Sequence, residues 1–344
     1  MAQSPQPRPT LTQTQATLVP AIEVALQNPT RLSPNGIRFA TFGDIAVTGN
    51  SHSDLERDPH AALDIDRLVQ TVPPAIAAAL THNAYYFVPL VIAEGRPTDA
   101  AGHRASHDET MISPIHTTEL ADQAICHRNV ELPNAVGEAG QPNTGPTEAV
   151  FISTRLLSDR FSLAFEFFIN VGHAFVDAAG VPEAFAELAW NQALADVRGE
   201  TSHDAWETRA HALNHNSSSR PLSEVEPGGL SSRSGAEGSA STLVSPTTAD
   251  APSEQSVLTA LGGPVATSAS PTPSPRTEYV EAAFADAVAI YLLSLALDFD
   301  YSELREREYP LLAPHALAER LRLTHRLYPP NPTYEFAIRY RRRA

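Results

Sequence analysis

The stretch RLLSDRFSLAFEFFINVGHAFVDAAG, residues 155–180, predicts a long helix buried on most of its surface, because apolar residues cover most of its turns. Four polar side chains interrupt it at spacings of four, three and four and therefore share one helix face. This polar stripe consists of Glu166, Asn170, His173 and Asp177. A buried polar group without a partner costs about 1 to 3 kcal/mol. Either Arg, Tyr or backbone partners satisfy the stripe, it faces a solvent-filled groove, or it lines a functional cleft.

The segments around this helix predict an α+β fold that is predominantly helical, with a small sheet before the main helices. Runs rich in β-branched and aromatic residues between Gly, Asn or Pro indicate strands at 36–49, 83–95 and 148–154. Apolar periodicity indicates a short helix that ends before Pro29. Longer helices are expected at 182–197, 277–299 and 313–327.

Composition divides the chain into one domain and three segments expected to stay outside its core. Residues 1–17 are rich in Gln, Pro and Thr, and residues 214–276 in Ser, Thr, Pro, Gly and Ala, so both are expected to be disordered. Neither flank of the insert offers enough apolar surface for a core of its own. Residues 18–213 and 277–338 are therefore expected to form a single domain, followed by a basic tail at 339–344.

Charge and residue usage exclude several classes of function. The formal charge of -16 disfavours general binding to nucleic acids and anionic membranes, because both would repel the chain. The sequence contains no Lys, which removes Schiff-base chemistry and lysine-based phosphate loops. Cys126 is the single cysteine, so no intramolecular disulfide forms, and a buried, inert thiol is expected. The first residues lack a signal-peptide pattern, and these features together predict a cytoplasmic protein, with the nucleus as the alternative.

Two segments resemble the zincin metallopeptidases, in particular the lethal-factor-like branch. FFINVGHAFVDAAGVPEAFAELAW, residues 167–190, resembles the active-site helix of that branch, in which HExGHAxD precedes a short turn and another helix. RTEYVEAAFADAVAIYLL, residues 276–293, resembles the helix that supplies the third zinc ligand. The resemblance covers roughly a fifth of the chain and implies a zincin-like fold.

Transferred residue by residue, the resemblance implies a degenerate HExxH motif. His173 stands at the second zinc-binding His, and Glu281 is the candidate third ligand, although Phe284 lies one residue farther from it than the family spacing. Ile169 stands at the first-ligand position and cannot bind a metal. Asn170 occupies the general-base position, and its amide does not titrate. Catalytic zinc requires three protein ligands and an open position, so no bound cofactor is expected, and zinc only if the site is functional.

Three hypotheses follow from these residues. The first is a pseudopeptidase, a zincin-like scaffold that binds a protein or peptide without hydrolysing it. The second is an active metal-dependent hydrolase in which His173 and Glu281 are completed by His116 or another loop His. The third is an unrelated helical interaction protein in which the polar stripe is an internal network. The sequence does not determine the oligomeric state.

Other candidate motifs carry weaker chemistry. Histidines with helical spacing occur in segments of loop or low-complexity composition, where solvated side chains are expected. They are His103 and His107 beside Asp108, and the pair His211 and His215. His116 and His127 follow the first pair farther along the chain. GEAGQPNTG, residues 137–145, lacks the residues of a phosphate loop and indicates a turn. DFDYSEL, residues 298–304, would support acid–base chemistry only if folding brought its carboxylates together.

Overall fold

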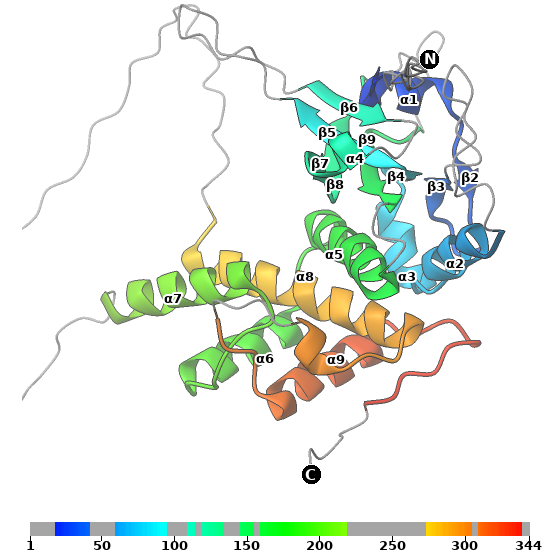
Figure 1. Cartoon of the computed structure of the whole chain (residues 1–344). Coiled ribbons are helices and arrows are strands. Elements are labelled where there is room, and N and C mark those ends of the chain that lie inside the picture. The colour runs from blue at the N-terminus through cyan, green and yellow to red at the C-terminus, as the bar shows by residue number, and fades with distance from the viewer. Residues whose placement is uncertain are drawn as a thin grey trace, which may run out of the picture.

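The protein combines two small β-sheets with a bundle of long helices, as the computed structural model in Figure 1 shows. The structure describes residues 18–41, 59–94, 109–113, 118–133, 145–154, 159–218, 273–304 and 309–338. The expected disordered N-terminus, the basic tail and most of the expected insert lie outside these residues. The predicted α+β class with predominant helix is confirmed.

A five-stranded mixed sheet has the order β2-β3-β4-β9-β8. The three inner strands are parallel, and the strands at both edges run antiparallel to their neighbours. Its strands are β2 (Arg31–Leu32), β3 (Arg38–Ala40), β4 (Asn83–Val88), β8 (His127–Glu131) and β9 (Glu148–Ser153). The predicted strand at 148–154 is confirmed as β9, whereas only Arg38–Ala40 of the expected strand at 36–49 forms a strand in the described residues.

The second sheet is antiparallel, with the order β1-β6-β5-β7. Its strands are β1 (Val19–Pro20), β5 (Leu90–Glu94), β6 (Glu109–Ser113) and β7 (Ala124–Ile125). The prediction of one strand at 83–95 is therefore wrong, since this run supplies β4 to one sheet and β5 to the other. Pro89 lies at the break, where its missing N–H would interrupt a sheet ladder.

The alternation of side chains along β4 separates two parts of the core. Tyr85 and Phe87 face the large hydrophobic cluster that includes α5 (Arg160–Ala179), while Tyr86 and Val88 face a smaller cluster with α1 (Ala21–Gln27). The predicted helix at 155–180 is confirmed within the described residues as α5. Asp159 caps its start by accepting hydrogen bonds from the Phe161 and Ser162 N–H groups.

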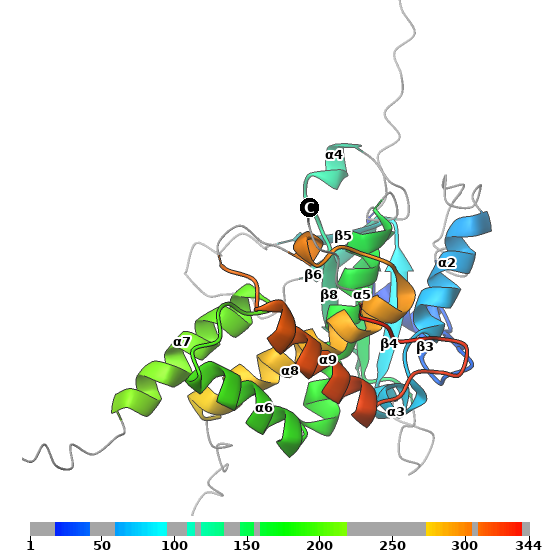
Figure 2. The same ribbon diagram turned by 90° about the horizontal axis from the view of Figure 1, so that it is seen from below.

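The remaining long helices pack below α5 in Figure 1. They are α6 (Glu183–Leu194), α7 (His203–Ser218), α8 (Pro275–Ala296) and α9 (Pro314–Leu327). Seen from below in Figure 2, α6, α8 and α9 lie against one another. The short elements are α2 (Pro59–Gln70), α3 (Pro74–Ala77), α4 (Thr118–Ala121) and the 3-10 helices η3 (Ala78–Leu80) and η6 (Tyr301–Leu304).

Helix α7 was not predicted from the sequence, and it shows that the expected start of the insert is wrong. The insert was expected to begin at residue 214, but α7 continues to Ser218, and α8 already begins at Pro275. The sequence of α7 is polar, and it packs on α8 through a narrow line of buried residues, Ala205, Arg209 and Ala212. Because so few apolar residues recur at helical spacing, the sequence gives only a weak helix signal, and the helix was missed.

Candidate functional site

The predicted motif helix α5 packs directly along α8, the helix that carries Glu281. The two backbones come close together at Gly172, where an added Cβ would lie 2.4 Å from the backbone oxygen of Ala285. Only a residue without a side chain allows the two backbones to come so near. The glycine of the motif therefore sets the distance between α5 and α8.

This crossing brings His173, Asp177 and Glu281 to one pocket of about 330 Å³. His173 and Asp177 are exposed on α5, and Glu281 is half-buried on α8. Helix α7 closes the pocket on a third side. The other lining residues are Val176, Asp204, Glu207, Thr208, Glu278 and Ala282. We call this the α5–α8 pocket.

The carboxylates of the α5–α8 pocket repel one another. Burial raises the pKa of the Glu281 carboxyl, and the negative charges of Asp177 and Glu278 raise it further. Among the described residues, the pocket lining contains His173 but no arginine. The acidic residues from α7 were missed by sequence analysis because α7 itself was missed, although Asp204 and Thr208 have the four-residue spacing of one helix face.

The other two members of the polar stripe lie outside this pocket. Glu166 contacts the imidazole of His127, which extends from the neighbouring strand β8. Asn170 is 7% exposed and donates a hydrogen bond of 2.8 Å to the backbone oxygen of Glu166 on its own helix. The stripe is thus divided, because Glu166 and Asn170 contact β8 and the α5 backbone, while His173 and Asp177 line an open pocket.

The position that the resemblance assigns to the first zinc ligand is apolar in structure as well as in sequence. Ile169 is partly buried and packs against the main hydrophobic cluster. Within the described residues, no group of three or more His, Cys, Asp or Glu side chains lies close enough to hold a metal ion. His173 and Glu281 share a pocket, but none of the described side chains supplies a third ligand beside them.

Asp286 connects the pocket to the interior of the helix bundle. It lies on α8, is 4% exposed, and accepts a hydrogen bond of 2.7 Å from the Thr201 hydroxyl. Burial raises the pKa of this carboxyl to about 6, even though the hydrogen bonds from Ser202 and Thr201 and the charge of His173 act in the opposite direction. The same buried group therefore contacts the loop before α7 and lies within electrostatic range of His173.

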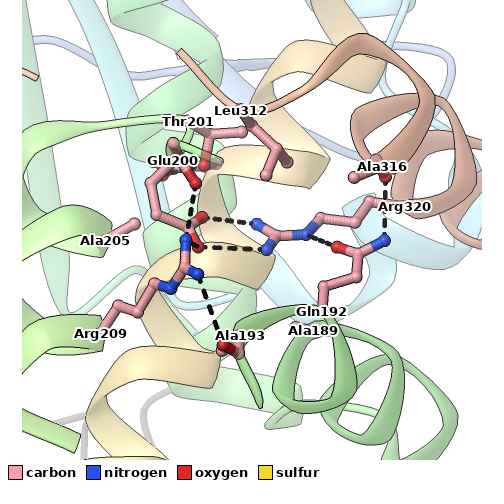
Figure 3. Close-up of polar contacts among 12 residues, drawn as sticks. Ala189, Gln192, Ala193, Glu200, Thr201, Ala205, Arg209, Leu312, Ala316 and Arg320 are labelled. Carbon is pink, nitrogen blue, oxygen red and sulfur yellow. Dashed lines mark hydrogen bonds and ion pairs between the residues drawn. The ribbon is translucent and has the colours of Figure 1, made fainter. Parts of the chain in front are cut away.

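A buried ionic cluster fixes the loop that leads into α7 (Figure 3). Glu200 is fully buried, and its carboxylate accepts hydrogen bonds from Arg320 at 2.9 Å and from the Tyr279 hydroxyl at 2.8 Å. Arg209 approaches the same carboxylate at 3.5 Å and donates to the Gly199 oxygen at 3.0 Å. Because α7, α8 and α9 each contribute one of these donors, the cluster holds α7 in position beside the α5–α8 pocket.

Strand β8 leaves one edge of the mixed sheet open, since no described strand pairs with its outer side. The hydrogen bond from the Ser153 N–H to the Cys126 oxygen identifies 126 and 153 as a hydrogen-bonded pair. Alternation along an antiparallel ladder then directs the backbone N–H and C=O groups of His127, Asn129 and Glu131 away from β9. These three residues are exposed, and His127 reaches α5.

The remaining candidates do not join the pocket. His127 lies on β8, and His211 and His215 are exposed on α7. Cys126 is in no disulfide and is half-buried rather than buried as expected. Asp298 and Asp300 line a separate groove of about 490 Å³ near the end of α8. His103, His107, Asp108, His116 and most of the expected turn at 137–145 lie outside the described residues.

No family model, curated protein or solved structure matches the chain. The function must therefore be inferred from the chemistry of these residues. Among the described helices, α8 is long and apolar enough to cross a membrane by length and composition, but 72% of its 18-residue window is buried inside the protein. Burial of this extent is typical of a helix in a protein core. The cytoplasmic or nuclear location remains a prediction.

Proposed function

We propose that this protein is a zincin-like pseudopeptidase that binds a protein or peptide without hydrolysing it. The observation that carries the proposal is the shared pocket of His173 and Glu281, which are distant in sequence. A zincin arrangement requires the third-ligand helix to approach the motif helix at this point. The close contact at Gly172 supports the same arrangement, because it explains why the motif needs glycine there.

The chemistry at the other two motif positions supports binding over hydrolysis. Ile169 offers a metal no lone pair and is packed against the core. Asn170 cannot accept a proton in the catalytic range, and its amide already donates to the backbone of α5. A zinc-activated water would therefore lack both a complete ligand set and a base.

The open edge of β8 supports an extended peptide segment as the bound partner. Strand addition at a free sheet edge lets backbone hydrogen bonds supply affinity, while the side chains beside the edge supply specificity. His127, Asn129 and Glu131 direct their backbone groups outward, and the contact between His127 and Glu166 joins this edge to α5. An added strand would lie next to the helix that carries the polar stripe.

The zincin geometry is tested by restoring the missing ligand with Ile169→His. Two imidazoles one helical turn apart have Cβ atoms about 5 to 6 Å from each other, which suits joint zinc ligation. With Glu281 as the third ligand, we expect zinc titration to give a tighter dissociation constant for the variant than for the parent, and zinc to raise the variant's melting temperature.

The matched control is Ala178→His, which adds an imidazole at an exposed position of the same helix that is not one turn from His173. This variant should show no gain in zinc affinity, and Ile169→His combined with His173→Ala should lose the gain. A folded Ile169→His variant that binds zinc no better than the parent would mean that the zincin resemblance is accidental.

The peptide-binding role is tested at Asn129. Peptides are first selected on the parent from a random display library. Asn129→Pro should then abolish their binding while leaving the fold intact, because it removes an outward N–H without breaking a hydrogen bond to β9. Asn129→Ala keeps that N–H and should bind the same peptides. The proposal fails if no peptide is enriched, or if the selected peptides bind the proline variant as tightly as the parent.

A further inference from the structure

Ser274 presents an exposed hydroxyl immediately before a proline at the start of α8. It is the N-cap residue of the helix, and Pro275 occupies the first helical position. The backbone at Ser274 is extended, with φ -71° and ψ 151°. Pro273, Ser274 and Arg276 are all exposed. The acceptor hydroxyl is therefore exposed on an extended residue that has a proline on each side.

Burial distinguishes Ser274 from the other Ser-Pro pairs whose serine lies in the described residues. Ser33, before Pro34, is 6% exposed and donates its N–H to the Ile37 oxygen. Ser113, before Pro114, is fully buried in β6. A kinase that requires proline after the acceptor would thus find both of these hydroxyls covered in the folded protein. Ser274 alone of the three is open.

We propose that Ser274 is a phosphorylation site for a proline-directed serine/threonine protein kinase. Kinases of this class accept a Ser or Thr hydroxyl that is followed directly by proline. The Ser274 Oγ attacks the γ-phosphorus of ATP, the bond from that phosphorus to the bridging oxygen of ADP breaks, and the hydroxyl proton passes to the base of the kinase. The products are phosphoserine and ADP.

The surroundings of Ser274 accommodate the phosphate. The Ser274 Oγ already accepts a hydrogen bond of 3.2 Å from the Thr277 N–H. A phosphate oxygen can accept a hydrogen bond from the same N–H, and its negative charge makes that bond stronger. The partial positive charge at the start of α8 also favours a dianion. The modified residue would keep its capping role, so phosphorylation does not require α8 to unwind.

The position also couples the modification to the α5–α8 pocket. Glu278 and Glu281 follow Ser274 by four and seven residues, which brings all three to one face of α8. A phosphate adds about 1.5 to 2 negative charges at the head of this acidic face. Because Glu281 already experiences repulsion from Asp177 and Glu278, phosphorylation would make the pocket less favourable to anionic groups.

The test incubates the folded full chain with a proline-directed kinase and ATP, and locates phosphate by fragmentation mass spectrometry. We expect phosphoserine at Ser274 and none at Ser33 or Ser113. Ser274→Ala should lose this phosphate, and Ser274→Thr should retain it as phosphothreonine. Fragmentation separates Ser274 from the neighbouring Ser270 and Thr272, which precede prolines and lie outside the described residues. A synthetic peptide of residues 268–280 and an unrelated Ser-Pro peptide serve as kinase controls.

Several results would overturn the proposal. The proposal is wrong if the kinase phosphorylates the 268–280 peptide but leaves Ser274 of the full chain unmodified. It is also wrong if the kinase phosphorylates the unrelated Ser-Pro peptide but not the 268–280 peptide. Phosphorylation of Ser33 and Ser113 to the same extent as Ser274 would show that the folded structure does not select Ser274. A separate measurement checks whether phosphoserine still caps α8. The melting temperature of the phosphorylated chain should equal or exceed that of the Ser274→Ala variant, and a lower value would contradict the capping role.

Discussion

At the scale of single residues, Asp286 has the most perturbed environment among the groups near the α5–α8 pocket. Its carboxyl is buried among α8, the loop before α7 and the His173 side of α5, and its pKa is raised to about 6. The folded protein therefore holds a proton on Asp286 at pH values where the unfolded chain has already released it. Stability must depend on pH through this one group.

Replacement by Asn tests that dependence, because the amide oxygen can still accept the Thr201 hydrogen bond. The contribution of Asp286 is fully present below pH about 4 and is lost as the pH rises through about 6. Between these limits the parent should lose about 3 kcal/mol of unfolding free energy relative to Asp286→Asn. Urea unfolding of both proteins from pH 4 to pH 7 measures the difference. A difference that does not change with pH would contradict the assigned pKa.

At the scale of elements, the contact between α5 and α8 determines the shape of the pocket. His173 and Asp177 come from one helix and Glu278 and Glu281 from the other, so their separation depends on how closely the two backbones approach. That approach is limited at Gly172, where the nearest neighbour is the backbone of Ala285 rather than a flexible side chain. Backbone atoms can move apart only if a whole helix shifts.

Gly172→Ala should therefore be destabilising even though alanine is the better helix former. Its Cβ would lie 2.4 Å from the Ala285 oxygen, and overpacking of this kind costs about 1 to 3 kcal/mol. Chemical denaturation measures the loss, with Ala178→Ser on the exposed side of α5 as a control expected to change stability by less than about 0.5 kcal/mol. A Gly172→Ala variant as stable as the parent would show that α5 and α8 are not in such close contact.

At the scale of the whole molecule, residues from both sides of the expected insert share one hydrophobic cluster. Helix α8 packs against α5, α6, α7 and α9, and its residues Tyr279, Phe284 and Tyr291 are fully buried. The same arrangement closes the α5–α8 pocket with α7 on one side. The walls of this pocket are therefore held in place by the packing of three helices.

The pseudopeptidase proposal predicts that the whole purified protein contains no stoichiometric zinc and has no peptidase activity that a chelator abolishes. The reason is the incomplete ligand set around His173, with Ile169 at the first-ligand position. Metal analysis by mass spectrometry and a peptide-cleavage assay measure both quantities, with His173→Ala as the matched variant. Near-equimolar zinc, together with activity that His173→Ala removes, would instead favour the hydrolase with a rearranged ligand set.

The helices at 160–179, 183–194, 275–296 and 314–327 could be predicted from sequence because each has a long apolar pattern or clear end signals. The spacing of Glu166, Asn170, His173 and Asp177 likewise depends only on helix geometry. Helix α7 and the division of 83–95 between two sheets could not be predicted in this way. A nearly polar helix and a strand break at proline both depend on which neighbours are available for packing and pairing.

By itself, the sequence determined which side chains the site contains, including the apolar Ile169 and the non-titrating amide of Asn170, because side-chain chemistry does not depend on the fold. Tertiary structure alone decided which of these residues meet. His173 and Glu281 share a pocket because α5 and α8 cross at Gly172, whereas Asn170 turns to its own helix and Glu166 to β8. Contacts between residues far apart in the chain arise from the packing of whole elements, and local spacing carries no information about that packing.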